Sequence, residues 1–255
     1  MTPELAVRTT PGAAVNALGG CGWRLSLPPG PARAYRWAQL DDYQTLPRAR
    51  FRWTPPLRLS LSARVSSANL PGTWGFGFWN DPFSVGLGLG GMARRLPAPP
   101  DTAWFFYASE PNYLALRDDH PAVGFLAATF ASARVPRWVV AGGLPMLPAL
   151  LWRPTARLVR RLLRHWVRED AASLAVDPTK WHDYVLECAP DGVRFCIDQN
   201  LVWETSVAPQ NRLGLVLWID NQYAAFPPTG RLRFGTLESP DPSWLELSEP
   251  AVESG

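Results

Sequence analysis

Residues 180–220 have the sequence KWHDYVLECAPDGVRFCIDQNLVWETSVAPQNRLGLVLWID, and this stretch decides the predicted fold. Apolar and polar side chains alternate in His182–Cys188, which is the period of a half-buried β-strand. A turn at Pro190-Asp191-Gly192 separates it from a second alternating strand, Val193–Ile197. Leu213–Asp220 is longer and more apolar, which indicates a central strand covered on both faces. The stretch therefore predicts an antiparallel meander followed by a central strand.

The composition supports an all-β protein with many turns. The chain has 255 residues, of which 47% are hydrophobic, enough for a substantial core. It contains 27 prolines and 20 glycines, so turns are frequent and long helices few. Many short strands separated by such turns are typical of an all-β sandwich.

Charge and cysteine spacing exclude several classes of site. The net charge of +3 is too small to indicate nucleic-acid binding, and no DNA- or RNA-binding motif is present. Cys21, Cys188 and Cys196 do not have the spacing of a metal site. We therefore expect no nucleic-acid partner, no metal site and no cofactor.

Two further features bear on location. The N-terminus, MTPELAVRTTPGAAV, lacks the basic and apolar regions of a signal peptide. The sequence has no run of about 18 uncharged apolar residues, so a transmembrane helix is not expected. These features predict a cytoplasmic protein.

Three motifs in the organising stretch point to one family. Trp-His-Asp-Tyr begins at residue 181, Pro-Asp-Gly-Val-Arg-Phe at 190 and Asp-x-x-Leu-Val-Trp-Glu at 198. This pattern resembles the concanavalin A-like lectin/glucanase superfamily, nearest to family 16 glycoside hydrolases, over roughly residues 50–240. Asn200 stands where that family usually has glycine, but asparagine tolerates the left-handed conformation. The resemblance implies a two-sheet antiparallel jelly-roll sandwich with a concave ligand-binding face, and by itself no activity.

The resemblance also implies where a catalytic strand would lie. Family 16 enzymes carry a Glu-x-Asp-x-x-Glu or Glu-x-Asp-x-Glu pattern, and the corresponding strand by chain order is 102–109, with the sequence TAWFFYAS. Retaining glycosidases need two carboxyl groups about 5 Å apart, and this strand supplies none. Ordinary family 16 hydrolysis is therefore not expected unless the acids come from elsewhere in the chain.

One strand has the pattern of a cleft floor. In residues 71–82, PGTWGFGFWNDP, alternation places three aromatic side chains on the core face and Gly75, Gly77 and Trp79 on the other. Glycines in a strand often mark a close approach by a ligand or another backbone. The alternative is close packing of the protein itself over the glycines. A similar Gly-x-Trp-Pro-Ala-x-Trp strand lines the concave face in family 16 relatives.

The end of the strand Leu213–Asp220 has the chemistry of a sugar site. An aromatic ring stacks on the apolar face of a sugar, and neighbouring amides and carboxylates bind its hydroxyl groups. A buried core tryptophan with a strand-end turn is the alternative. The predicted ligand-binding residues are Trp79, Asn80, Asp81, Tyr107, Asn112, Trp218, Asn221 and Gln222.

Four titratable residues are candidates for catalysis. They are Glu110, Asp118, His120 and Asp220. Glu110 with a neighbour from residues 118–120 would form an acid/base pair in a loop at the rim, and Glu110 or Asp220 is the expected general acid. The alternative for residues 109–120 is a solvated turn with a local network of acidic, basic and histidine side chains.

Residues 137–172 are unusual for this fold and are interpreted as an insertion. An apolar segment broken by proline and glycine precedes a helical pattern over 153–170. An apolar stripe lies opposite a basic one: Leu151, Leu158, Leu162 and Trp166 against Arg153, Arg157, Arg160, Arg164 and Arg168. Three hypotheses follow: a lid that packs on its own sandwich, a homodimer contact, or peripheral contact with an anionic membrane through residues 150–168.

The sequence thus predicts an irregular arm over 1–34, a jelly-roll domain over 35–240 and a loose tail over 241–255. Three functions remain open. The first is binding of a small molecule or glycan in an aromatic concave cleft. The second is an enzyme on the same fold, a glycosidase, lyase or cyclase with relocated acids. The third is handling of an apolar or membrane-borne ligand.

Overall fold

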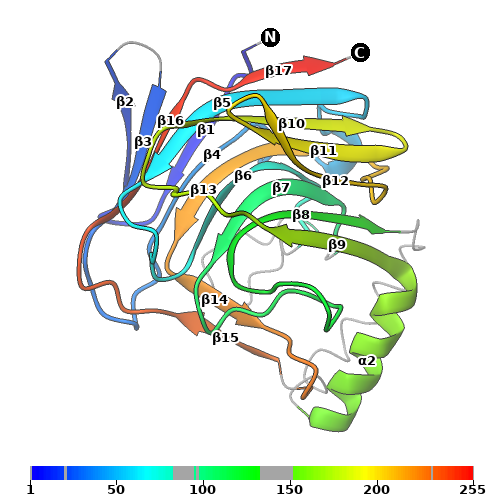
Figure 1. The fold of residues 1–255 in the computed structure, drawn as a ribbon. Helices are drawn as coiled ribbons and strands as arrows, with labels where there is room; N and C mark the ends of the chain where they lie inside the picture. The colour runs from blue at the N-terminus through cyan, green and yellow to red at the C-terminus, as the bar shows by residue number, and fades with distance from the viewer. Residues whose placement is uncertain are drawn as a thin grey trace.

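The molecule is a sandwich of two antiparallel β-sheets that pack face to face (Figure 1). The computed structural model describes residues 2–19, 22–82, 95, 98–132, 152–230 and 232–254. A seven-stranded sheet, here called the concave sheet, curves around the lower part of the molecule in Figure 1. Its order is β1 (Ala6–Thr9), β4 (Trp37–Asp41), β13 (Gly214–Asp220), β6 (Thr73–Trp79), β7 (Thr102–Ala108), β8 (Gly124–Ser132) and β9 (Val167–Ser173).

The second sheet, here called the outer sheet, covers the convex side of the first (Figure 1). Its order is β12 (Asn200–Thr205), β11 (Gly192–Ile197), β10 (His182–Ala189), β5 (Leu57–Val65), β16 (Ser243–Ser248), β3 (Gly22–Leu27) and β2 (Ala14–Leu18), and β17 (Ala251–Ser254) also pairs with β5. A small hairpin, β14 (Gln222–Ala225) and β15 (Arg233–Thr236), and the helix α2 (Arg153–Trp166) lie on the hollow side of the concave sheet. A short 3-10 helix, η1, spans Arg48–Arg50. The predicted all-β jelly-roll sandwich with a helix that begins at residue 153 is confirmed.

The organising stretch folds as predicted. Strands β10, β11 and β12 form an antiparallel meander in the outer sheet, and β13 is buried along its whole length in the concave sheet. The turn at residues 198–200 differs from the expectation that Asn200 takes the left-handed conformation. The residues with positive φ are Asp198 (51°) and Gln199 (67°), whereas Asn200 already begins β12. Its side-chain amide donates a hydrogen bond to the carbonyl oxygen of Asp198 at 3.0 Å, which closes the turn.

The hydrophobic core fills the space between the two sheets. On β6 the three side chains expected to face the core, Trp74, Phe76 and Phe78, are all at least 99% buried. Phe76 and Phe105 each contact the ring of Tyr184 from β10, with centroids 5.0 Å apart in both pairs. Burial of large aromatic side chains from both sheets is the main source of stability in such a sandwich.

Both ends of the chain are more ordered than expected. The N-terminal 34 residues contain β1, β2 and β3 rather than an irregular arm, and β1 and β3 join different sheets. The segment 241–255 contains β16 and β17 rather than a loose tail. Leu245 and Leu247 of β16 are completely buried because this strand lies between β5 and β3. These terminal strands are short and are flanked by proline and small residues. Their alternation of apolar and polar side chains is therefore too weak to predict a strand.

The insertion is shorter at its C-terminal end than expected. Helix α2 ends at Trp166, and residues 167–173 form β9, the strand at one edge of the concave sheet, paired with β8. The apolar segment 137–151, which includes Leu151 of the predicted stripe, lies outside the described residues. No helix in the described part of the chain is long and apolar enough to cross a membrane.

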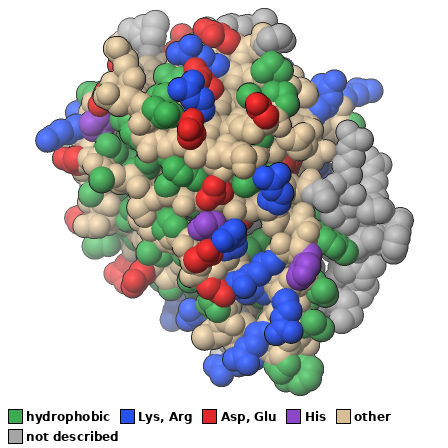
Figure 2. Space-filling view, turned by 45° about the vertical axis from the view of Figure 1, so that its right-hand side comes forward, with side chains coloured by type: hydrophobic (Ala, Val, Ile, Leu, Met, Phe, Trp, Pro, Cys, Tyr) green, Lys and Arg blue, Asp and Glu red, His purple; other side chains and the backbone are tan. Residues whose placement is uncertain are grey.

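Helix α2 is turned the opposite way from the lid prediction. Leu158, Leu162 and Trp166 of the expected packing stripe are 53%, 52% and 44% exposed. Arg160, expected on the solvent side, is almost fully buried, as is Ala156. Figure 2 shows basic and hydrophobic side chains side by side on this part of the surface. A dimer contact and an anionic membrane contact through this surface remain predictions.

This orientation is explained by the hydrogen bonds that the Arg160 side chain forms. Its guanidinium donates hydrogen bonds to the carbonyl oxygens of Ala115 (2.7 Å) and Phe226 (2.5 Å), and to the carboxylate of Asp118 (2.8 Å). Arg164 also forms an ion pair with Asp118 and donates to the carbonyl oxygen of Leu116 at 2.5 Å. Charged hydrogen bonds to otherwise unpaired carbonyls are among the stronger ones in proteins, and they outweigh burial of the apolar stripe here.

Candidate functional site

A cavity of about 400 Å³ lies over the hollow face of the concave sheet, on the side away from the core. Strands β4, β13, β6, β7, β8 and β9 contribute to its lining from above, and β14, β15 and Leu163 of α2 from the opposite side (Figure 1). Binding sites for small molecules commonly have volumes of about 300–1,000 Å³ and are mostly apolar. The size of this cavity suits a small molecule rather than a long polymer.

Aromatic rings from three strands form its floor. They are Trp218 of β13, Trp79 of β6, and Trp104 and Phe106 of β7. Trp79 and Trp218 are parallel, with an interplanar angle of 5° and centroids 6.4 Å apart. Trp104 touches Trp79, Trp218 and Phe106 at centroid distances of 5.9, 5.3 and 5.1 Å. The four rings therefore form one continuous aromatic surface.

The strand register explains how this surface forms. Trp218 is opposite Gly75, Gly75 is opposite Phe106, and Phe106 is opposite Leu126, so these residues form one row across the sheet. A Cβ atom at Gly75 would lie 2.8 Å from Cη2 of Trp218 and 2.4 Å from the carbonyl oxygen of Phe105. The glycine therefore lets the Trp218 indole lie across β6 towards Phe106. Close packing over the glycine, the alternative left open by the sequence, is the arrangement found.

Buried polar atoms beside the aromatic floor lack a hydrogen-bond partner among the described residues. The indole Nε1 of Trp104 and the hydroxyl of Thr102 are examples, and both residues line the cavity. The Trp218 indole, in contrast, donates to the Thr73 hydroxyl at 2.9 Å. Buried polar groups are normally paired, so unpaired donors beside a cavity are consistent with a polar partner inside it.

Asp220 provides a carboxyl group at one edge of the floor. Its Oδ1 accepts hydrogen bonds from the hydroxyl of Thr73 (2.9 Å), the backbone N–H of Thr73 (3.3 Å) and the backbone N–H of Gln222 (3.1 Å). Within the described part of the chain, Asp220 forms no ion pair. Burial raises the pKa of this carboxyl group to about 7, although the hydrogen bonds oppose that change. Near neutral pH, Asp220 is therefore able to give or take a proton.

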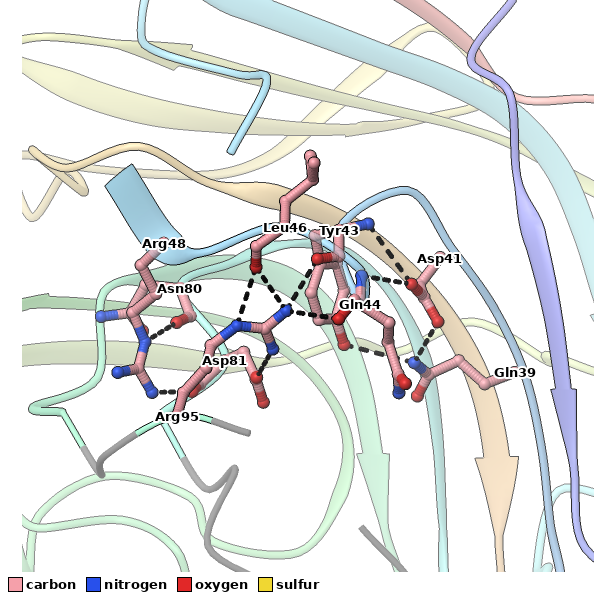
Figure 3. Close-up of polar contacts among 9 residues, drawn as sticks. All are labelled: Gln39, Asp41, Tyr43, Gln44, Leu46, Arg48, Asn80, Asp81 and Arg95. Atoms are coloured by element: carbon pink, nitrogen blue, oxygen red, sulfur yellow. Dashed lines mark hydrogen bonds and ion pairs between the residues drawn. The ribbon is translucent and has the colours of Figure 1, made fainter. Parts of the chain in front are cut away.

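A second carboxyl group of the lining, that of Asp81, belongs to the polar cluster shown in Figure 3. The Arg95 guanidinium forms an ion pair with Asp81 and donates hydrogen bonds to the carbonyl oxygens of Tyr43 (2.7 Å) and Gln44 (2.8 Å). Burial raises the pKa of Asp81 to about 6, and the positive charges of Arg95 and Arg48 limit the rise. These contacts tie Arg95 to residues 43–44 and to Asp81, all of which line the cavity.

The other half of this cluster is held by Gln39 of β4. Its amide donates to a carboxylate oxygen of Asp41 (3.0 Å) and to the Tyr43 hydroxyl (3.2 Å) (Figure 3). Asp41 also accepts hydrogen bonds from the backbone N–H groups of Tyr43 (3.3 Å) and Gln44 (2.9 Å). Burial raises the pKa of both the Asp41 carboxyl and the Tyr43 hydroxyl. Because these groups satisfy one another, they position the wall and leave Asp220 as the better candidate for chemistry.

Glu169 of β9 is the third buried carboxyl group of the lining. Its Oε2 accepts hydrogen bonds from the backbone N–H groups of Leu116 (2.6 Å) and Arg117 (3.0 Å). Burial raises its pKa, while these two hydrogen bonds and nearby positive charges oppose the rise. Glu169 thus fastens the loop 112–118 to the edge of the sheet.

The described residues contain no group of three or more His, Cys, Asp or Glu side chains that could hold a metal ion.

Six of the residues predicted from the sequence come together around this cavity. They are Trp79, Asp81, Asn112, Trp218, Asp220 and Gln222. Asn112 has a mainly structural role within the lining, because its amide joins the carbonyl oxygen of Ser109 to the backbone N–H of Ala224, both at 2.9 Å. The remaining predicted residues lie elsewhere.

Three predicted ligand-binding residues are corrected by the structure. Tyr107 lies in the core between the sheets, stacked on Trp74, because alternation along β7 sends only residues 102, 104 and 106 to the cavity. Asn80 donates to the carbonyl oxygen of Pro99 (2.9 Å) and accepts from the backbone of residue 101 (3.1 Å). Asn221 is completely buried, and its side-chain amide binds backbone groups of two segments, residues 34–36 and Leu237.

Three candidate catalytic residues do not line the cavity. Glu110 is exposed at a turn, and His120 lies 3.5 Å from Asp170. Arg164 and Arg160 beside Asp118 lower the pKa of that carboxyl group, which suits an ion pair and not a proton donor. Of the four candidates, only Asp220 lines this cavity, and the predicted acid/base pair of Glu110 with a neighbour from residues 118–120 stays a prediction.

Several lining residues were not recognised from the sequence. Trp104 and Phe106 are the most important, and strand alternation applied to residues 102–108 would have separated them from Tyr107. The helical pattern over 153–170 includes Glu169, so the sequence does not place this residue in the sheet. Tyr35 and Gln39 meet Asp220 and Trp218 only through pairing of distant strands, for which the local sequence gives no signal.

Comparisons with known proteins agree on the fold. No protein-family model and no curated protein matches this sequence. A family 16 endo-glucanase from Bacteroides ovatus is similar in structure, with a TM-score of 0.52 and 8% identity over 98% of this chain and 94% of that one. The kappa-carrageenase of Pseudoalteromonas carrageenovora gives 0.50 and 10% identity over 93% and 81%. Other matching chains are longer: this chain spans 17% of a sialidase and 54% of a Clostridium perfringens endo-β-galactosidase. The fold is therefore that of the concanavalin A-like, family 16-like jelly rolls.

Proposed function

We propose that this chain binds a short carbohydrate, or a conjugate that carries one, in the cavity over its concave sheet. The observation that carries the proposal is the aromatic floor around Trp218 with the carboxyl group of Asp220 at its edge. Sugars bind by stacking on aromatic rings while polar groups take their hydroxyls. The similarity to kappa-carrageenase, which was solved in complex with an oligotetrasaccharide, supports the proposal.

The test is a binding panel of mono- to tetrasaccharides measured by thermal shift and calorimetry. For the saccharide that binds, Trp218→Ala is expected to weaken affinity at least tenfold, about 1.4 kcal/mol. If Trp218→Ala does not fold, Trp218→Phe is the second test. It keeps an aromatic ring at this position and should retain part of the affinity. Trp181→Ala is the matched control, because this half-exposed tryptophan lies under Arg64 of the outer sheet, away from the cavity. Equal effects of the changes at Trp181 and Trp218, or no binding by any saccharide, contradict the proposal.

A second function, proton transfer to a bound glycan, is favoured by one observation. Asp220 is buried beside Trp218 with a pKa near 7 and with its described hydrogen bonds concentrated on Oδ1. A carboxylic acid that keeps its proton near neutral pH can act as a general acid towards a glycosidic oxygen. Asp220→Asn should lower turnover of a substrate at least a hundredfold while changing its affinity little. Unchanged turnover in this variant would exclude Asp220 as the general acid, and no turnover by either protein would restrict the function to binding.

A further inference from the structure

The lining of the cavity changes in polarity from one side of the concave sheet to the other. The sheet order runs β4, β13, β6, β7, β8, β9 across the cavity. Neighbouring strands are about 4.8 Å apart, so β13 and β8, three spacings apart, are separated by roughly 14 Å. A ligand that fills the cavity therefore contacts different chemistry at its two ends.

The side formed by β4 and β13 is polar. Gln39 of β4 and Asp220 of β13 line it, with Thr73 of β6 and Gln222 of β14 bonded or adjacent to Asp220. The ring of Tyr35 also lines this side and stacks on Trp37, with centroids 6.3 Å apart. Asp220 has no cation near it among the described residues, and its Oδ1 is occupied while its Oδ2 has no described partner. A sugar hydroxyl group can donate to this Oδ2 or accept from it when it is protonated.

The side formed by β8, β9 and α2 is aliphatic and aromatic. Its lining residues are Leu126, Ala128, Phe130, Val167, Ala171 and Leu163. Among the described residues, Glu169 is the one charged side chain in this part of the lining, and its Oε2 accepts hydrogen bonds from the backbone N–H groups of residues 116 and 117. A purely polar sugar would lose water here without gaining hydrogen bonds. An apolar chain would gain by burial.

We propose that the ligand of this cavity is amphiphilic: a sugar at the β4–β13 side, continued by an alkyl or aryl group over β8 and β9. This rests on the proposed function and specifies its ligand class. The aromatic floor between the two sides suits both parts, because Trp218 is opposite Gly75 and Phe106 is opposite Leu126 in the same row. A glycoside with an apolar aglycone, or the head of a glycolipid with the start of its chain, has this chemistry.

The experiment compares methyl with n-octyl glycosides of glucose, galactose, mannose and N-acetylglucosamine, below micelle-forming concentrations, by calorimetry on the full chain. For the sugar that binds, the octyl form should bind at least tenfold tighter than the methyl form. Ala171→Leu narrows the apolar side at an edge strand and should reduce this ratio to about threefold or less, with the methyl glycoside unaffected. Ala172→Leu, the next residue of β9 and not part of the lining, is the matched control and should preserve the ratio.

The outcomes separate this inference from the proposed function. Equal affinity for methyl and octyl forms overturns the amphiphilic ligand and leaves sugar binding intact. A tenfold preference that survives Ala171→Leu also overturns it, because the chain then lies outside the cavity. Binding of n-octanol as tight as that of the octyl glycoside removes the role of the polar side and overturns it too. Failure of every glycoside to bind contradicts both proposals.

Discussion

Strands β6 and β7 carry aromatic side chains on both faces, and the two faces serve different purposes. On the inner face, Phe76 and Phe105 are completely buried, and both contact the ring of Tyr184 from the outer sheet. On the outer face, Trp104 and Phe106 are also buried, but they border a cavity and the Trp104 indole has no described hydrogen-bond partner. Burial alone does not distinguish core from site; the empty space beside a ring does.

The largest expected effect tests this comparison directly on two neighbouring residues. Phe105→Ala should lower the free energy of unfolding by about 3–5 kcal/mol, because it opens a hole between the sheets. Phe106→Ala should cost clearly less, about 1–2 kcal/mol, because its ring already borders empty space. Urea denaturation of both variants gives the two values. Equal losses would mean that the outer face is packed like the core.

The next effect concerns the buried carboxyl group at the cavity edge. In the folded chain the pKa of Asp220 is about 7, whereas an unfolded aspartate titrates near pH 4. Between these values the folded chain holds a proton that the unfolded chain has released. The free energy of unfolding should therefore fall as pH rises from about 4 to 7, by an amount on the order of 3 kcal/mol, and level off above.

Asp220→Asn isolates this contribution, because asparagine keeps the Oδ1 acceptor used by Thr73 and Gln222. The difference in unfolding free energy between wild type and variant should change across that pH interval and stay constant above it. The other buried carboxyl groups with a raised pKa, such as those of Asp81, Asp41 and Glu169, titrate in both proteins, and their contributions cancel. A difference that is constant from pH 4 to 8 would show that Asp220 is ionised throughout.

A smaller effect tests how α2 is attached below the cavity. Arg160→Met should lower the free energy of unfolding by about 1–3 kcal/mol, because the carbonyl oxygens of Ala115 and Phe226 lose their charged donor. Arg161→Met is the matched control on the exposed side of the same turn and should stay within about 0.5 kcal/mol. Thermal and urea unfolding measure both. A larger loss for Arg161→Met than for Arg160→Met would instead support the predicted orientation, in which the basic face of α2 is exposed.

Much of the fold could be predicted because the central strands have strong local patterns. The stretch 180–220 and strand β5 alternate clearly, and the two-sheet sandwich follows from them together with the family resemblance. The terminal strands could not be recognised, because β16 is identified by its pairing with β5 and β3 and not by its own residues.

The candidate site was predicted in part. Trp79, Trp218 and Asp220 were found because aromatic and carboxyl groups follow one another on single strands. The orientation of α2 was missed because helical periodicity shows two faces but not which one finds partners. The decisive partners of Arg160 are backbone carbonyls 45 and 66 residues away in sequence, which no local pattern reveals.

The most direct test of the central claim is a crystal structure of the chain with the tightest-binding glycoside of the panel. The account predicts electron density for the sugar ring against Trp218, with a hydroxyl group within hydrogen-bond distance of Asp220. Density on the outer sheet or on the exposed side of α2, with the concave cavity holding only water, would contradict it.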